Sequence, residues 1–353
     1  MDESCARLSF LKTLCGDAII LFAMNISGEE WMSGILSRVV VADIGGTNAR
    51  FALIDGGELR PIETMAVADY PDFGAALEAF LDSHKERGHI SGAILAAAGP
   101  VEEGHCVLTN SNWVIDAAQL RAAFGFSHVR IINDFEAVAW SLPQLASTDL
   151  FSLGAGKRLP HAPAIVLGPG TGFGLACLVP RPNGAMVIGT EGGHVTLPGT
   201  CRREDGVIEL LRERYGHASV ERVLSGEGLS NLYQALATLD GLSLSERDAA
   251  EIVKAALADS CPTSRAALDM FCALLGTVAG DAVLTFKARG GVYIAGGIAP
   301  RIPEYLARSQ FRPRFEAKGR FQDYVASIPA SIIVHPDPAF LGLQFLAKQK
   351  FGS

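Results

Sequence analysis

The sequence lacks the cysteine patterns that stabilise small secreted or metal-binding domains. Its 353 residues include seven cysteines, at positions 5, 15, 106, 177, 201, 261 and 272, and no Cys-x-x-Cys pair. An odd number of isolated cysteines is not typical of a disulfide framework or a zinc cluster. We therefore expect reduced thiols and a cytoplasmic location.

The sequence also lacks an excess of positive charge and a membrane-spanning run at its start. The formal net charge is -8, whereas a general nucleic-acid binder usually carries a basic patch. The apolar stretch 18–24 is far shorter than the roughly 20 residues of a membrane span, and the start, Met1-Asp2-Glu3-Ser4, is acidic where a secretory signal is basic. We expect no nucleic-acid or membrane partner, and we interpret residues 1–37 as an N-terminal extension outside the fold.

Two common nucleotide-binding motifs are absent as well. A P-loop around Gly156-Lys157 would need a glycine and a hydroxyl where Phe151 and Arg158 stand. The Rossmann spacing fails because Phe173 occupies the place of the third glycine, and a strand pattern follows where a helix is required. The chain therefore matches neither motif.

What the sequence does contain is an apolar share of 49%, enough for a sizeable core, and two similar strand–glycine turn–strand units. The first spans 39–54 with Gly45-Gly46 at its tip, and the second begins at 164 with the turn 168–174. Bare glycine backbones can approach an anion closely. Each unit alone could be an ordinary β-hairpin, but the pair suggests a duplicated fold that grips a polyphosphate from both sides. Asp43, at the end of its strand, could hold a hydrated Mg²⁺.

The stretch 130–135 places Asn133 and Asp134 between an apolar strand and a helical pattern. In open α/β sheets, ligands bind at the carboxyl ends of the strands. The same two residues could simply cap the next helix. Our hypothesis is that Asp134 is a general base for a substrate hydroxyl, and capping is compatible with that role.

Several other features allow two interpretations from the residues alone. Trp113 is either a core residue or part of a sugar-facing loop, and Glu221 and His194 are either structural or ligand-binding. The turn 295–298 either connects a strand to a helix or accommodates a flat ring such as adenine. We expect a domain boundary near 142–143 and a closing helix, 339–348, that packs on the first domain. Other helices are expected at 71–87, 116–124, 135–143, 206–215, 229–237, 246–258 and 263–288.

Taken together, these stretches resemble the glucokinases of the bacterial hexokinase-like type, within the actin-like ATPase superfamily. The resemblance runs from about Val39 to the C-terminus. The motifs that carry it are Asp43-Ile-Gly-Gly-Thr47-Asn48-Ala-Arg50, Thr109-Asn110-x-x-Trp113, Ile131-Ile-Asn133-Asp134-Phe135, Gly170-Thr-Gly172-x-Gly174, Glu191-Gly-Gly-His194, Glu221-Arg-Val-Leu-Ser-Gly226 and Ala295-Gly-Gly297-Ile-x-Pro300-Arg301.

The resemblance implies an α/β fold with two actin-like (ribonuclease H-like) lobes. Each lobe would be a mixed β-sheet with flanking helices, and the active site would lie in the interdomain cleft. The small domain would comprise 38–144 plus 335–353, and the large domain 145–334. A homodimer is expected on the same ground.

The resemblance also implies transfer of the γ-phosphoryl group of ATP, with Mg²⁺, to the 6-hydroxyl of glucose, with Asp134 as base. The glucose-binding residues would be Asn133, Asp134, Glu191, His194 and Glu221. The phosphate-binding turns match 43–50 and 168–174, and the adenosine site matches 295–298. The residues expected to contact the nucleotide are Asp43 (also the Mg²⁺ residue, through water), Gly45, Gly46, Thr47, Asn48, Gly170, Thr171, Gly172, Gly296 and Gly297. Pro169 departs from expectation, because proline offers no N–H to a phosphate.

Two alternatives share this type of fold. Kinases of the ROK family, which act on other hexoses or N-acetylhexosamines, carry a Cys-rich zinc motif after the Gly-His segment. Here Cys201 alone stands nearby, which disfavours zinc and leaves His194 for the sugar. A sugar-responsive regulator would need a DNA-binding domain in front, and 37 residues are too few for one.

Overall fold

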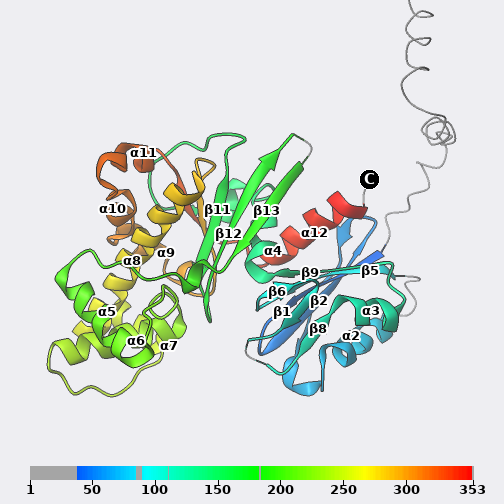
Figure 1. The fold of residues 1–353 in the computed structure, drawn as a ribbon, viewed down its shortest axis with the longest axis horizontal. Helices are drawn as coiled ribbons and strands as arrows, with labels where there is room; N and C mark the ends of the chain where they lie inside the picture. Colours follow the sequence, from blue (N-terminus) through cyan, green and yellow to red (C-terminus); the bar gives the residue numbers. More distant parts are fainter. Residues whose placement is uncertain (1–37, 85–89, 110, 183, 352–353) are drawn as a thin grey trace, which may run out of the picture.

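The computed structural model describes residues 38–84, 90–109, 111–182 and 184–351. The N-terminal extension and Asn110 of the Thr-Asn-x-x-Trp motif lie outside the described residues. Figure 1 shows two β-sheets, each with its own helices, side by side along the longest axis of the molecule. The α/β class expected from the sequence is confirmed.

The first sheet is built from the N-terminal part of the chain. Its main order is β3-β2-β1-β5-β9, and β4 pairs with β2. β1 and β2 form the expected hairpin, whereas β1, β5 and β9 run parallel. The valines of β1 are buried on both faces because helices cover the sheet. The elements are β1 (Arg38–Ile44), β2 (Asn48–Asp55), β3 (Glu58–Leu59), β4 (Glu63–Ala66), α2 (Phe73–Asp82), β5 (Ile90–Ala97), α3 (Ala117–Phe124) and β9 (His128–Asn133).

The second sheet repeats the central arrangement of the first. Its order is β10-β15-β14-β11-β12-β13, with β11 and β12 antiparallel and β11, β14 and β15 parallel. The second expected hairpin is therefore confirmed. A three-stranded sheet of β6 (Val101–Glu102), β7 (His105–Val107) and β8 (Val114–Asp116) lies beside the first sheet. The strands of the second sheet are β10 (Leu150–Ser152), β11 (Ala164–Pro169), β12 (Phe173–Arg181), β13 (Gly184–Thr190), β14 (Val292–Ile294) and β15 (Ala330–Ile333).

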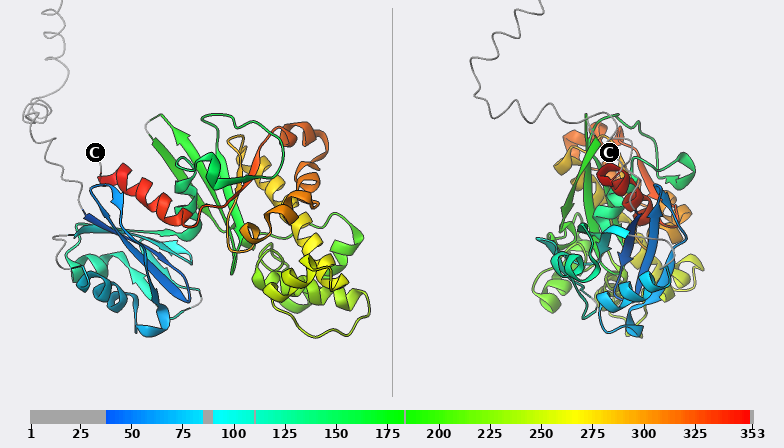
Figure 2. Two further views of the ribbon diagram at one scale, coloured as in Figure 1. Left: turned by 180° about the vertical axis from the view of Figure 1, so that it is seen from behind. Right: turned by 90° about the vertical axis from the view of Figure 1, so that its right-hand side faces the viewer.

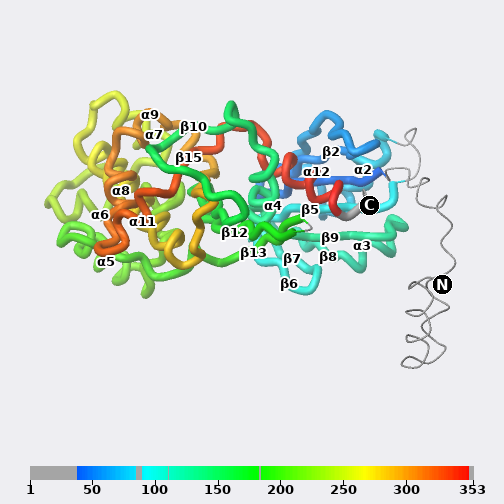
Figure 3. Tube along the Cα trace, turned by 90° about the horizontal axis from the view of Figure 1, so that it is seen from above, coloured from blue at the N-terminus to red at the C-terminus, as the bar shows by residue number. Residues whose placement is uncertain are grey.

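A helical region covers the second sheet, as the reverse view and the view from above show (Figures 2 and 3). Its centre is α8, which by length and composition could cross a membrane, but 78% of its apolar window is buried inside the protein. Gly276 and Gly280 allow α8 to approach the backbone of α10, because a Cβ at either position would overlap a carbonyl oxygen. α8 is thus a core helix. The helices here are α5 (Arg202–Tyr215), α6 (Gly226–Leu239), α7 (Ala249–Leu257), α8 (Pro262–Phe286), α9 (Pro303–Arg308), α10 (Phe311–Glu316) and α11 (Gln322–Ala326).

Two helices join the sheets. α4 (Asp134–Ser141) and α12 (Pro338–Phe351) lie between them in Figure 1, and Trp140 and Phe340 belong to one apolar cluster that takes in both sheets. The helices approach closely, because a Cβ at Gly342 would overlap the carbonyl oxygen of Ala137. α4 begins one residue earlier than expected, at Asp134. The junction therefore fixes the position of Asp134 between the two halves.

Candidate active site

The site begins at the carboxyl ends of three parallel strands. Ile44, Ala97 and Asn133 stand in register across β1, β5 and β9. Asn133 is the N-cap of α4: its Oδ1 accepts the N–H of Phe135 at 2.9 Å, and its Nδ2 donates to the Gly99 carbonyl at 3.3 Å. The capping interpretation is therefore correct for Asn133, whereas Asp134 is the first residue of the helix itself. Capping leaves the Asn133 side chain able to bind a ligand, because an amide oxygen accepts two hydrogen bonds and an amide nitrogen donates two.

Asp134 is the first residue of α4 and carries a shifted pKa. Burial raises the pKa of its carboxyl to about 6, and the nearby negative charge of Asp43 adds to that rise. Hydrogen bonds oppose the shift, among them the Phe135 N–H that Oδ1 accepts at 2.8 Å. A carboxylate with a pKa just below neutrality suits a general base, because it is ionised at working pH yet still attracts a proton.

Arg50 connects the first glycine turn to the C-terminal helix. It stands opposite Asp43 in the β1–β2 hairpin and donates to that carboxylate and to Asp337 Oδ1, the latter at 2.7 Å. Its guanidinium carbon lies 5.3 Å from the centre of the Phe340 ring in α12. Arg50 is part of a motif in the sequence, but the motif alone predicted no role for it. The local signal was its position across the hairpin from Asp43.

The tips of both hairpins are open to ligands. Thr47, Asn48 and Thr171 are exposed, and Gly45 and Gly170 are half-buried. The first turn is closed by the Gly45 N–H, which donates to the Asn48 carbonyl at 3.0 Å. In the second turn the Gly170 N–H donates to the Gly172 carbonyl at 2.8 Å. Two short, exposed glycine turns are thus available for phosphate groups.

Two glycines of the second turn make room for protein side chains. A Cβ at Gly172 would overlap the Glu221 carboxylate, which accepts the Phe173 N–H at 2.8 Å. A Cβ at Gly174 would overlap the ring of Phe135, the residue that follows Asp134. The second turn is therefore in contact both with Glu221 and with the start of α4.

Glu191 and His194 flank a buried Gly-Gly pair in the turn after β13. Both side chains are exposed, and His194 Nε2 lies 3.8 Å from Glu191 Oε2. The Gly193 carbonyl accepts the Glu221 N–H at 2.8 Å, so the turn lies directly beside Glu221. Glu221 itself stands in a turn. The structure thus brings the predicted sugar-binding residues of the second half together with the second glycine turn.

Trp113 belongs to the core. It is 3% exposed, and its indole N–H donates to the Tyr70 carbonyl at 3.3 Å. The rings of Trp113 and Phe73 are in a T-shaped arrangement, with centroids 6.1 Å apart. The core interpretation of Trp113 is confirmed, and the sugar-facing alternative for this side chain is wrong.

A cavity of about 450 Å³ lies beside the turn 295–298. Gly296 has a φ of +84°, a conformation that favours glycine, and a Cβ there would overlap the Pro169 carbonyl oxygen. Pro169 thus contributes its carbonyl, which accepts the Ile298 N–H at 3.3 Å. The far wall is α7, for which the sequence predicted a helix but no functional role. The cavity is lined by Ala249, Ala250, Val253, Lys254, Leu257, Gly297, Ile298 and Arg301.

Metal-ligand chemistry is sparse in this fold. Within the residues that the structure describes, no three His, Cys, Asp or Glu side chains form a group suited to holding a metal ion. Asp43 has one oxygen engaged by Arg50. These residues are better suited to a cation that keeps most of its water and binds phosphate, as Mg²⁺ does, than to a cation held in a cage of protein ligands.

Comparison with known proteins identifies similar chains. The family model described as Glucokinase matches residues 40–350. The glucokinase of Paramagnetospirillum magneticum is 46% identical over 308 residues, which are 86% of this chain and 96% of that protein. A crystal structure of a glucokinase from an Antarctic psychrotroph is 35% identical, covers 89% of this chain and 99% of its own, and has a TM-score of 0.80. A crystal structure of a ROK family glucokinase from Streptomyces griseus, in complex with glucose and AMPPNP, is 19% identical and has a TM-score of 0.58. The match covers 89% of this chain and 100% of that one, and at this identity it shows a shared fold alone.

Proposed function

The chain belongs to the glucokinase family, and from that premise we propose that Asp134 is the general base for transfer of the γ-phosphoryl group of ATP to the 6-hydroxyl of glucose. The activity is that of an ATP-dependent hexose kinase. The observation that supports Asp134 best is its position at the junction of the two halves, next to Phe135, which packs on the second glycine turn. Its carboxyl also has a pKa of about 6.

Phosphoryl transfer asks a protein mainly for positioning and charge stabilisation. A sugar hydroxyl is a poor nucleophile, so Asp134 would accept its proton as the new P–O bond forms. Asn133, Glu191, His194 and Glu221 would bind the remaining hydroxyls. A site with such polar groups rejects analogues that lack a hydroxyl, because its own donors and acceptors are left unpaired.

The nucleotide would bind across both glycine turns. Its phosphates would meet the hydroxyls at the two tips and those backbone N–H groups that the turns do not use themselves. Its adenosine would occupy the cavity between α7 and the turn 295–298. The cavity supports this placement, because most of its lining side chains are apolar and two are cationic, Lys254 and Arg301. Mg²⁺ would neutralise phosphate charge, with Asp43 as the residue that holds it through water.

Initial-rate assays test this function. ADP formation is measured with glucose, mannose and fructose side by side, and with ATP, ADP or polyphosphate as donor. We expect glucose and ATP to be the preferred pair and activity to require Mg²⁺. Absence of turnover with every sugar would contradict the kinase proposal.

Assembly and location are part of the same proposal. We propose a cytoplasmic homodimer. Light scattering after size-exclusion chromatography should then give a mass of about twice the 37.3 kDa of one chain. A single-chain mass at working concentration would contradict the dimer.

Filling the cavity should weaken nucleotide binding selectively. We expect Val253→Trp to raise KM for ATP by about 10-fold or more, because the indole would occupy the volume proposed for adenosine. KM for glucose should stay within about twofold. Leu284→Trp is the matched control, because Leu284 is a partly exposed residue of α8 and does not line the cavity. Equal KM values for ATP in Val253→Trp and in Leu284→Trp would rule out this placement of adenosine.

A further inference from the structure

The backbone around Glu221 is hydrogen-bonded on both sides of the residue. Its N–H donates to the Gly193 carbonyl at 2.8 Å, and its own carbonyl accepts the hydroxyl of Ser225 at 2.8 Å. The next carbonyl, that of Arg222, accepts Nδ2 of Asn231 at 3.0 Å. Two of these bonds restrain Glu221 itself and the third restrains its neighbour, so this turn has little freedom to reorient.

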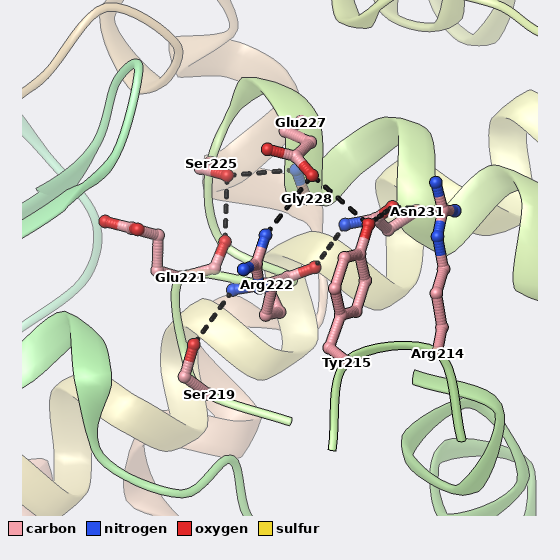
Figure 4. A network of polar contacts seen from close by, with 9 residues as sticks. All are labelled: Arg214, Tyr215, Ser219, Glu221, Arg222, Ser225, Glu227, Gly228 and Asn231. Carbon is pink, nitrogen blue, oxygen red and sulfur yellow. Dashed lines mark hydrogen bonds and ion pairs between the residues drawn. The ribbon is translucent and has the colours of Figure 1, made fainter. Parts of the chain in front are cut away.

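Asn231 is a buried polar member of this arrangement (Figure 4). It is 4% exposed and lies on α6, and its Oδ1 accepts from the Tyr215 hydroxyl at 3.0 Å and from Arg214 Nη1 at 3.4 Å. The Tyr215 hydroxyl also lies 3.2 Å from Glu227 Oε1. Arg214 can only donate and the Arg222 carbonyl can only accept, so these two groups select the amide orientation in which Nδ2 faces the Arg222 carbonyl. The Tyr215 ring is held in turn by the guanidinium of Arg222, whose carbon lies 4.0 Å from its centre.

The carboxylate of Glu221 points away from this network, as Figure 4 shows, and accepts the Phe173 N–H of the second glycine turn. The network therefore leaves the carboxylate free for other partners and restrains the backbone that carries it. Small errors of position in a polar site are costly, because directional hydrogen bonds to a substrate weaken steeply when donor and acceptor are misaligned.

We propose that Asn231 is a positioning residue for sugar binding: through the Arg222 carbonyl it holds the Glu221 backbone so that the carboxylate faces the sugar. The proposal rests on the proposed function, in which Glu221 binds a glucose hydroxyl. Tyr215 acts one step further back, by orienting the Asn231 amide.

Asn231→Asp is the direct test. The substitution keeps size and the Oδ1 acceptor but sets an oxygen against the Arg222 carbonyl where Nδ2 now donates. We expect KM for glucose to rise about 10-fold or more, while KM for ATP changes less than about threefold. Tyr215→Phe should also raise KM for glucose, by a smaller factor. Gln234→Glu, the same chemical change one turn further along α6, is the matched control and should leave both constants unchanged.

A double-mutant cycle separates positioning from general loss of structure. Glu221→Gln alone should raise KM for glucose, and adding Asn231→Asp should raise it no further, because the group being positioned is already altered. If Glu221→Gln raises KM for glucose and Asn231→Asp does not, the inference is wrong and the proposed function stands. The same conclusion follows if the effects of the two substitutions on KM for glucose multiply in the double variant. If Glu221→Gln has no effect, the sugar-binding role of Glu221 fails and the inference fails with it. Should Asn231→Asp not fold, Tyr215→Phe in the same cycle decides.

Discussion

Asp134→Asn is expected to lower kcat by about 10²–10⁴-fold while glucose affinity stays within about threefold. The carboxamide has nearly the same shape and can still hydrogen-bond a hydroxyl, but it cannot accept the hydroxyl proton. Initial rates with saturating ATP give kcat, and isothermal titration calorimetry gives the affinity for glucose. Unchanged turnover would show that the base lies elsewhere.

The stability of the same variant serves as its folding control. The folded protein holds the Asp134 proton up to about pH 6, above the ordinary pKa of 3.8. The folded state therefore binds more protons than the unfolded state between these values, and the contribution of Asp134 to stability falls as pH rises through this window. Above about pH 6 the buried charge is a cost that asparagine removes. We expect Asp134→Asn to melt at or above the wild-type temperature at pH 7.5, so that its loss of kcat is chemical.

Gly174→Ala should damage both stability and catalysis. The added methyl would overlap the ring of Phe135, and overpacking a buried contact typically costs about 1–3 kcal/mol. The overlap reaches Cγ of the ring and not just its far edge, so we expect the start of α4, which carries Asp134, to be displaced. We therefore expect a lower unfolding free energy in urea and a kcat reduced by about 10-fold or more, since small misplacements of a reacting group are costly.

Two further variants identify the cause of that effect. Phe135→Leu shortens the side chain that collides, and combined with Gly174→Ala it should recover part of the lost stability. Gly206→Ala, on α5, is the control: a methyl there would meet only the side chain of Leu239, so the change should be neutral or slightly stabilising. Wild-type stability and activity in Gly174→Ala would contradict the contact between α4 and the second turn.

The hairpins and the strand-to-helix edge could be predicted because their signals are local. A β-branched run such as Val39–Val41, glycines at the tip and a resumed strand pattern predict a hairpin, and both hairpins are confirmed. Asn133 ends an apolar strand, and its capping of the next helix was an expected alternative from that position. The catalytic role of Asp134 stays a prediction. The core position of Trp113 was one of two stated alternatives.

Roles that depend on distant partners could not be predicted in the same way. The glycines at 172 and 174 were interpreted as backbone for phosphate, whereas each also accommodates a side chain from elsewhere in the chain, Glu221 and Phe135. Arg50 pairs with Asp337, 287 residues away, and no local pattern marks that contact. The sequence of α7 predicts a helix, but only the fold shows that this helix lies beside Gly297 and forms a wall of the cavity. Such contacts arise from packing and not from local propensity.

The pH dependence of kcat/KM for glucose tests the role of Asp134 most directly, because this parameter reports the ionisation of the free enzyme. A general base works when deprotonated, so the wild-type rate should fall below a midpoint near pH 6, where Asp134 takes up its proton. The residual activity of Asp134→Asn should lack that acid limb. An acid limb at the same pH in both proteins, or none in the wild type, would contradict Asp134 as the base.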